Sequence, residues 1–122
     1  MLIHHPPLTD QSRWKHLTDA DAFQAMIRRV GCEVVLHGHN HRSEIARIAG
    51  PKGAIPVLGV TSASAARGSK YGRARYHLLR IAREEGGWRL QVQIRALTPD
   101  DSGCEPDGDL VFHGSDLADM VA

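Results

Sequence analysis

The sequence predicts an α/β fold, and three features of its pattern support that prediction. A short apolar run at residues 1–4 is followed by an amphipathic helical pattern and then by a second apolar run at residues 34–36. Two pairs of strand-like segments come next, each pair joined by a glycine-rich turn. The order strand, helix, strand is that of a parallel βαβ unit, whereas strand pairs across short turns are typical of hairpins.

The first half of the chain contains the elements of the predicted βαβ unit. Residues 1–4 predict a buried strand, which Pro6 and Pro7 end before a polar loop at residues 8–17. Thr18 or Asp19 is suited to cap the next helix, and Gly31 to end it. The helix is predicted from apolar residues that recur every three or four positions: Ala22, Phe23, Met26, Ile27 and Val30. Residues 32–37 then predict the second buried strand.

The second half of the chain predicts two hairpins and a tail. Residues 43–49 and 55–60 flank a Gly-Pro-Lys-Gly turn, and residues 73–83 and 88–97 flank a Glu-Glu-Gly-Gly turn. Residues 61–72 are small and polar, which indicates a loop. We expect one domain over residues 1–97, followed by a mobile acidic tail at 98–122, because that segment is rich in Asp, Gly and Pro.

The composition excludes several classes of protein. Among 122 residues, 15 Lys and Arg oppose 14 Asp and Glu, so the net charge is +1. A general nucleic-acid or acidic-membrane binder would carry a basic excess, and no apolar run approaches the roughly 20 residues that span a bilayer. Cys32 and Cys104 lack the spacing of a zinc site, so we expect free thiols. We find no leader segment and expect a cytoplasmic protein.

The eight histidines are clustered, and the clusters follow the two predicted buried strands. His39 and His41 alternate just after the second strand, and a strand period of two would place them on one side. His4 ends the first strand. If the two strands are neighbours, all three imidazoles meet at one rim of the sheet, where a metal ion could bind. The remaining isolated histidines are expected to be structural or surface residues: His16, His37, His77 and His113.

These motifs resemble one enzyme superfamily. His-His-Pro-Pro at 4–7, one helix, and then Val-Val-Leu-His-Gly-His-Asn-His at 34–41 resemble the C-terminal half of calcineurin-like metallophosphoesterases. The likeness is greatest to the bacterial class III cyclic-nucleotide phosphodiesterases and covers about residues 1–97. It implies the C-terminal half of a four-layer α/β/β/α sandwich.

The resemblance also implies a mechanism and roles for individual residues. Two divalent transition-metal ions, Fe, Mn or Zn, would clamp a phosphodiester or phosphomonoester and supply a hydroxide nucleophile. His4 and His39 would bind one ion, and His41 the other. His5 would line the substrate pocket as the candidate catalytic residue.

The superfamily's Asp-x-His, Gly-Asp-x-x-Asp and Gly-Asn-His motifs are missing from the chain. We therefore expect the chain to be the C-terminal part of a longer hydrolase, inactive by itself. The alternative is a truncated, non-catalytic remnant that binds at most one metal ion. A nuclease of the same superfamily is a third possibility, which the net charge of +1 does not favour. Neither the substrate nor the oligomeric state can be inferred from these residues.

Overall fold

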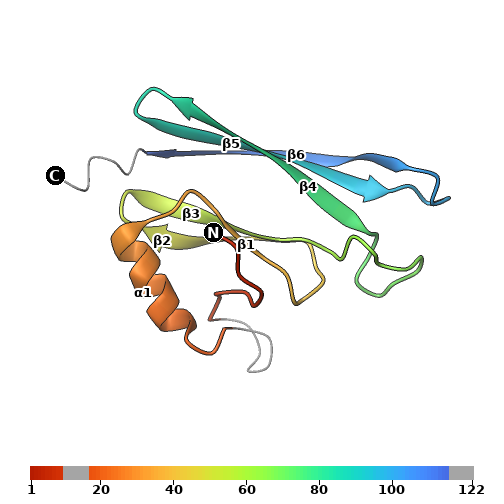
Figure 1. The fold of residues 1–122 in the computed structure, drawn as a ribbon, viewed down its shortest axis with the longest axis horizontal. Coiled ribbons are helices and arrows are strands. Elements are labelled where there is room, and N and C mark those ends of the chain that lie inside the picture. Colours follow the sequence, from red (N-terminus) through yellow and green to blue (C-terminus); the bar gives the residue numbers. More distant parts are fainter. Residues whose placement is uncertain (10–16, 116–122) are drawn as a thin grey trace.

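A computed structural model describes residues 1–9 and 17–115 of the chain. In these residues the fold is mixed α/β, with one helix and two three-stranded sheets (Figure 1). One sheet has the strand order β1-β3-β2, and the other has the order β4-β5-β6. The elements are α1 (Ala20–Val30), β1 (Val35–His37), β2 (Glu44–Gly50), β3 (Gly53–Gly59), β4 (Arg75–Glu84), β5 (Gly87–Leu97) and β6 (Cys104–Ser115).

The predicted helix is confirmed by α1. Its apolar stripe packs on the first sheet, where Ile27 is fully buried. Gly31 ends the helix at φ 76°, a left-handed conformation, and its N–H donates to the Ile27 carbonyl oxygen at 2.8 Å. The basic residues Arg28 and Arg29 lie in the last turn, where the helix dipole favours positive charge.

The predicted neighbours, residues 1–4 and the strand before Gly38, lie side by side. Leu2 forms a parallel bridge with Leu36. The Leu36 N–H donates to the Met1 carbonyl at 2.9 Å, and the Ile3 N–H donates to the Leu36 carbonyl at 3.0 Å. Because α1 connects these two parallel segments, the predicted βαβ crossover is confirmed. The prediction that residues 1–4 form a buried strand is wrong: the segment pairs with β1 through an isolated bridge at Leu2, and Met1 and Leu2 are 48% and 79% exposed.

Both predicted hairpins are also confirmed. Strands β2 and β3 pair antiparallel from Glu44 opposite Gly59 to Gly50 opposite Gly53, and β1 pairs parallel with β3. Strands β4 and β5 pair antiparallel across the 84–87 turn. Cys32 and Cys104 are both free thiols, as their spacing predicts.

The prediction of a mobile tail after residue 97 is wrong for residues 104–115. They form β6, which pairs antiparallel with β5 along its whole length. Leu110 and Phe112 alternate on the inner face of β6 and pack against Leu90 and Val92, and this burial holds the strand in place. The polar residues 98–103 form the preceding turn, and Pro106 is tolerated because β6 is an edge strand. Residues 116–122 lie outside the described part.

The described residues form three layers with two cores (Figure 1). Ile27, Val35 and Val57 belong to the core between α1 and the first sheet. Leu58, Leu90 and Phe112 belong to the core between the two sheets. The layers follow the order α/β/β, so the fourth layer implied by the resemblance is absent from the described ranges 1–9 and 17–115. Within these ranges, no helix has the length and apolar character needed to cross a bilayer.

Candidate metal centre

The chain turns sharply after β1, and this turn places His39. Gly38 follows the last residue of β1, and its N–H donates to the His4 carbonyl oxygen at 3.1 Å. His39 has a φ of 62° and His41 has a φ of 54°, so both lie in the left-handed region that residues other than glycine rarely adopt. The hydrogen bond from Gly38 thus joins the end of the 1–4 segment to the end of β1 at the rim of the first sheet.

Three imidazoles meet at this rim: His4, His5 and His39. The Nδ1 atom of His39 lies 3.1 Å from the Nε2 atom of His4. The ring centroids of His5 and His39 are 4.2 Å apart, and His4 lies 5.0 Å from each of the other two. One nitrogen of each ring lies within 4.8 Å of the others. We call these three residues the histidine group.

The histidine group has the donor type that a transition-metal ion prefers. Zn–N bonds of about 2.0–2.1 Å place the donors of one tetrahedral ion about 3.3 Å apart. The 3.1 Å separation of the His4 and His39 nitrogens is close to this spacing. Partial burial lowers the pKa of His5, and the nearby charges of His39 and His4 lower it further. A lowered pKa favours the neutral imidazole, which is the form that binds metal.

His4 and His39 follow the two predicted strands and were expected to meet, and the structure brings them together. It also adds His5 to the same group, because the chain bends at His4 and His5 before Pro6. His41 is not in the group. Its ring faces Tyr71, with the ring centroids 5.6 Å apart. The expectation that His39 and His41 lie on one side assumed an extended strand, but both residues have left-handed backbones.

His37 has a structural place at the end of β1, in line with its expected role. Its side chain is 1% exposed, and its Nε2 atom lies 3.7 Å from a carboxylate oxygen of Glu44. The ring fills the space beside Gly59, where a Cβ atom would come within 2.7 Å of it. Glu44 also accepts a hydrogen bond from the Asn40 side chain at 3.5 Å. This carboxylate therefore lies against His37 and Asn40 rather than in the histidine group.

An open cavity of about 540 Å³ adjoins the histidine group. It lies between the 1–3 segment and β4, and His39 and His41 line it together with apolar side chains: Leu2, Ile3, Leu36, Leu58, Val60 and Leu79. One further residue lies here, His77, which we expected to be a structural or surface histidine. Its Nε2 atom is buried and has no hydrogen-bond partner among residues 1–9 and 17–115, and burial lowers its pKa, with a further contribution from Arg75. The alternation of β4 could have predicted this position, because residues two apart lie on the same face of a strand and Leu79 also lines the cavity.

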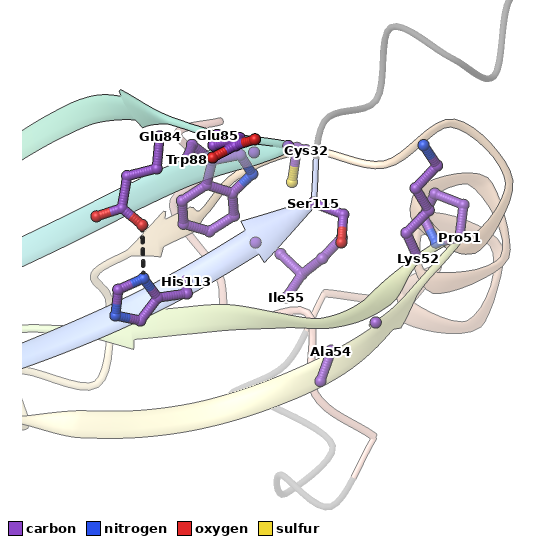
Figure 2. Close-up of a pocket in the computed structure, with 14 residues that line it drawn as sticks. Cys32, Pro51, Lys52, Ala54, Ile55, Glu84, Glu85, Trp88, His113 and Ser115 are labelled. Atoms are coloured by element: carbon purple, nitrogen blue, oxygen red, sulfur yellow. Dashed lines mark hydrogen bonds and ion pairs between the residues drawn. The ribbon is translucent and has the colours of Figure 1, made fainter.

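A second cavity, of about 360 Å³, lies near the turns of the two hairpins (Figure 2). Figure 2 shows Trp88 and Cys32 on its wall and an ion pair between His113 and Glu84, whose Nδ1 and Oε2 atoms are 2.9 Å apart. Burial raises the pKa of the Cys32 thiol, which keeps this thiol protonated and unreactive. None of the site residues predicted from the sequence lines this cavity.

The donor set fits one metal ion, but it does not by itself fit two. Within the part of the chain that the structure describes, the histidine group is the one cluster of three or more His, Cys, Asp or Glu side chains with metal-ligand spacing. All three donors are imidazole nitrogens, which cannot carry negative charge as carboxylates do. Two divalent ions in close proximity need anionic ligands, and no carboxylate belongs to this cluster.

Comparisons with known proteins give a partial structural likeness. No family model matches the sequence, and no curated protein matches it. The chain is similar to three structures of Vps29 from Entamoeba histolytica, each of which it matches over 51% of that structure's length. The TM-scores are 0.49 for a double mutant, 0.46 for the wild type complexed with Zn²⁺ and 0.43 for a single mutant. The sequence identities are 21%, 16% and 20%, over 83%, 84% and 83% of this chain. The chain thus spans about half the length of these structures. Every TM-score is below 0.5, so we draw no functional argument from the likeness.

Proposed function

We propose that this chain binds a divalent transition-metal ion through His4, His39 and His5, and that it forms the histidine side of a metal-dependent phosphoester hydrolase. The observation that carries the proposal is the histidine group itself, three imidazoles whose nitrogens lie within 4.8 Å of one another. Imidazole nitrogens at this spacing are the donor type that a divalent transition-metal ion prefers.

The residues of the proposed site would have separate roles in metal binding and substrate binding. His4 and His39 hold the ion as neutral imidazoles, and their proximity is fixed by the hydrogen bond from the Gly38 N–H to the His4 carbonyl. A bound ion supplies Lewis acidity at the phosphoryl oxygen. His5 binds as the third donor, or lines the substrate pocket as the resemblance implies. The adjacent apolar cavity accepts the organic group of the ester.

A two-metal centre would need more than the described residues. His41 lines the same cavity as His39 and would contribute to the second ion. We propose that the bridging carboxylate comes from polypeptide outside residues 1–122, and that Fe, Mn or Zn occupies both positions in the complete domain. The substrate would be a small phosphodiester or phosphomonoester.

A second candidate function is non-catalytic metal binding. It is favoured by the donor set, since the described residues supply three neutral nitrogens and no carboxylate to the cluster. One ion bound in this way would stabilise the rim of the first sheet without turnover.

The two functions can be separated by titration and turnover. We would titrate the purified chain with Zn²⁺ and Mn²⁺ by calorimetry and assay the hydrolysis of bis(p-nitrophenyl) phosphate, using wild type, His39→Ala and His113→Ala. We expect zinc binding that His39→Ala abolishes and His113→Ala preserves. Metal-dependent hydrolysis lost with His39→Ala supports the hydrolase. One bound ion without hydrolysis supports the second candidate for this chain, and an absence of zinc binding contradicts both.

A further inference from the structure

The connection between β3 and β4 runs past His41 and is fixed at both ends. Thr61 is 2% exposed, and its hydroxyl donates to the Arg73 carbonyl oxygen at 2.7 Å. This hydrogen bond closes the segment 61–73 into a loop. Within the loop, the Tyr71 N–H donates to the Ser69 hydroxyl at 3.2 Å, and the Gly72 N–H donates to the Ser69 carbonyl at 3.0 Å. The loop therefore holds residues 69–72 in a defined turn.

The loop carries three cations, and two of them are already neutralised. Arg67 donates to the Asp101 carboxylate at 3.0 Å. Arg73 donates to the Glu105 carboxylate at 2.5 Å and to the Leu97 carbonyl oxygen at 2.6 and 2.9 Å. Both guanidinium groups thus connect the loop to the turn and strand that follow β5, and their charge is compensated by carboxylates.

Lys70 differs from these two arginines. Its ammonium lies 4.9 Å from the centroid of the Tyr71 ring, and the structure gives it no carboxylate partner among the described residues. The Tyr71 ring in turn lies beside the ring of His41, with the ring centroids 5.6 Å apart. An ammonium, a phenol ring and an imidazole therefore follow one another from the loop to the edge of the cavity that His39 also lines.

We infer that Lys70, positioned by Tyr71, binds the phosphoryl oxygens of an anionic ligand at the edge of the cavity that His39 and His41 line. The inference rests on the proposed function and deepens it, because it assigns the recognition of the phosphate charge to a residue outside the metal ligands. A lysine ammonium is a mobile point charge that suits phosphate. The cation–π contact with Tyr71 restrains this side chain near His41 without neutralising its charge.

The test measures phosphate binding separately from metal binding and turnover. We would titrate inorganic phosphate into the wild-type chain, with and without Zn²⁺, by calorimetry and by the line width of its ³¹P resonance. The variants are Lys70→Ala, Lys70→Arg, Tyr71→Leu and Lys52→Ala. Lys52 lines the other cavity and is the matched lysine control. Arg42→Ala provides a second comparison, because Arg42 follows His41 in the sequence.

We expect Lys70→Ala to weaken phosphate binding about fivefold or more, the scale of one partly screened charge. Zinc affinity should not change. Lys70→Arg should restore most of the binding, Tyr71→Leu should weaken it by a smaller factor, and Lys52→Ala should have no effect. A general loss of folding would not be reversed by Lys70→Arg, so this variant separates a binding role from a structural one.

Each remaining outcome is decisive. Equal phosphate affinity in wild type and Lys70→Ala overturns the inference, and a loss with Arg42→Ala alone transfers the role to Arg42. If the wild type binds no zinc, the proposed function fails, and the metal-free titration still decides the inference. Phosphate binding that depends on Lys70 then identifies an anion site, whereas an absence of phosphate binding overturns the inference.

Discussion

Two cavities of this molecule have histidine on their walls, but their histidines have different neighbours. At one rim, His4, His5 and His39 face one another, and no carboxylate joins them within the described residues. In the other cavity, His113 pairs with Glu84 at 2.9 Å, with side chains 62% and 41% exposed. Exposed pairs of this kind contribute at most about 1 kcal/mol.

The comparison shows that the chemistry of a histidine is set by its partners. An imidazole beside a carboxylate can accept a proton and form a surface ion pair. Three adjacent imidazoles present several nitrogen donors to one point, and the lowered pKa of His5 favours the neutral form that binds metal. The following three changes test this difference, from the largest expected effect to the smallest.

Replacing His5 should affect metal affinity far more than replacing His41. If a four-ligand zinc site contributes about 10–16 kcal/mol, one ligand accounts for about 3 kcal/mol, which is more than 100-fold in affinity. We expect His5→Ala to lower the zinc affinity by about this factor, measured by titration against a competing chelator. His41→Ala should lower the zinc affinity by less than about threefold, because His41 contacts Tyr71 and lies outside the histidine group. Equal losses in both variants would contradict the assignment of His5.

Replacing Gly114 should affect the other cavity alone. A Cβ atom at Gly114 would approach the Trp88 ring to 2.1 Å, so Gly114→Ala must displace the indole. Overpacking of this kind lowers the free energy of unfolding by about 1–3 kcal/mol. Urea denaturation, monitored by tryptophan fluorescence, measures this change in the free energy of unfolding. Gly103→Ala is the matched control, since a Cβ atom there meets nothing within 4 Å. Zinc affinity should not change in either variant, and a change with Gly114→Ala would show that the two regions are coupled.

Lowering the pH should destabilise the chain in part through His77. Burial lowers the pKa of His77 below its ordinary value of 6.5, so the unfolded chain takes up the proton first as the pH falls. The stability contributed by neutral His77 is complete above pH 6.5 and is lost as the pH falls towards the lowered pKa. We expect His77→Gln to show a shallower fall in melting temperature between pH 7.5 and 5.5. A slope identical to that of the wild type would refute this contribution.

Much of the fold could be predicted because its signals are local. The stripe around Ile27 predicts α1, and the two glycine-rich turns predict the hairpins. Strand β6 was missed because its signal, the alternation of Leu110 and Phe112, lies among residues that are typical of disorder. Its stability comes from burial against Leu90 and Val92, which are distant in the sequence.

The sequence by itself determined that His4 and His39 end adjacent parallel segments, because a βαβ crossover brings the ends of its two strands to one rim. Only the tertiary structure decided the rest of the site. The bend at residues 4–5 turns His5 into the histidine group, and the left-handed backbone at His39 and His41 leaves the His41 ring outside the group, against Tyr71. Periodicity describes regular strands, whereas the residues of this site lie just beyond the strand ends, where neighbouring segments set the backbone.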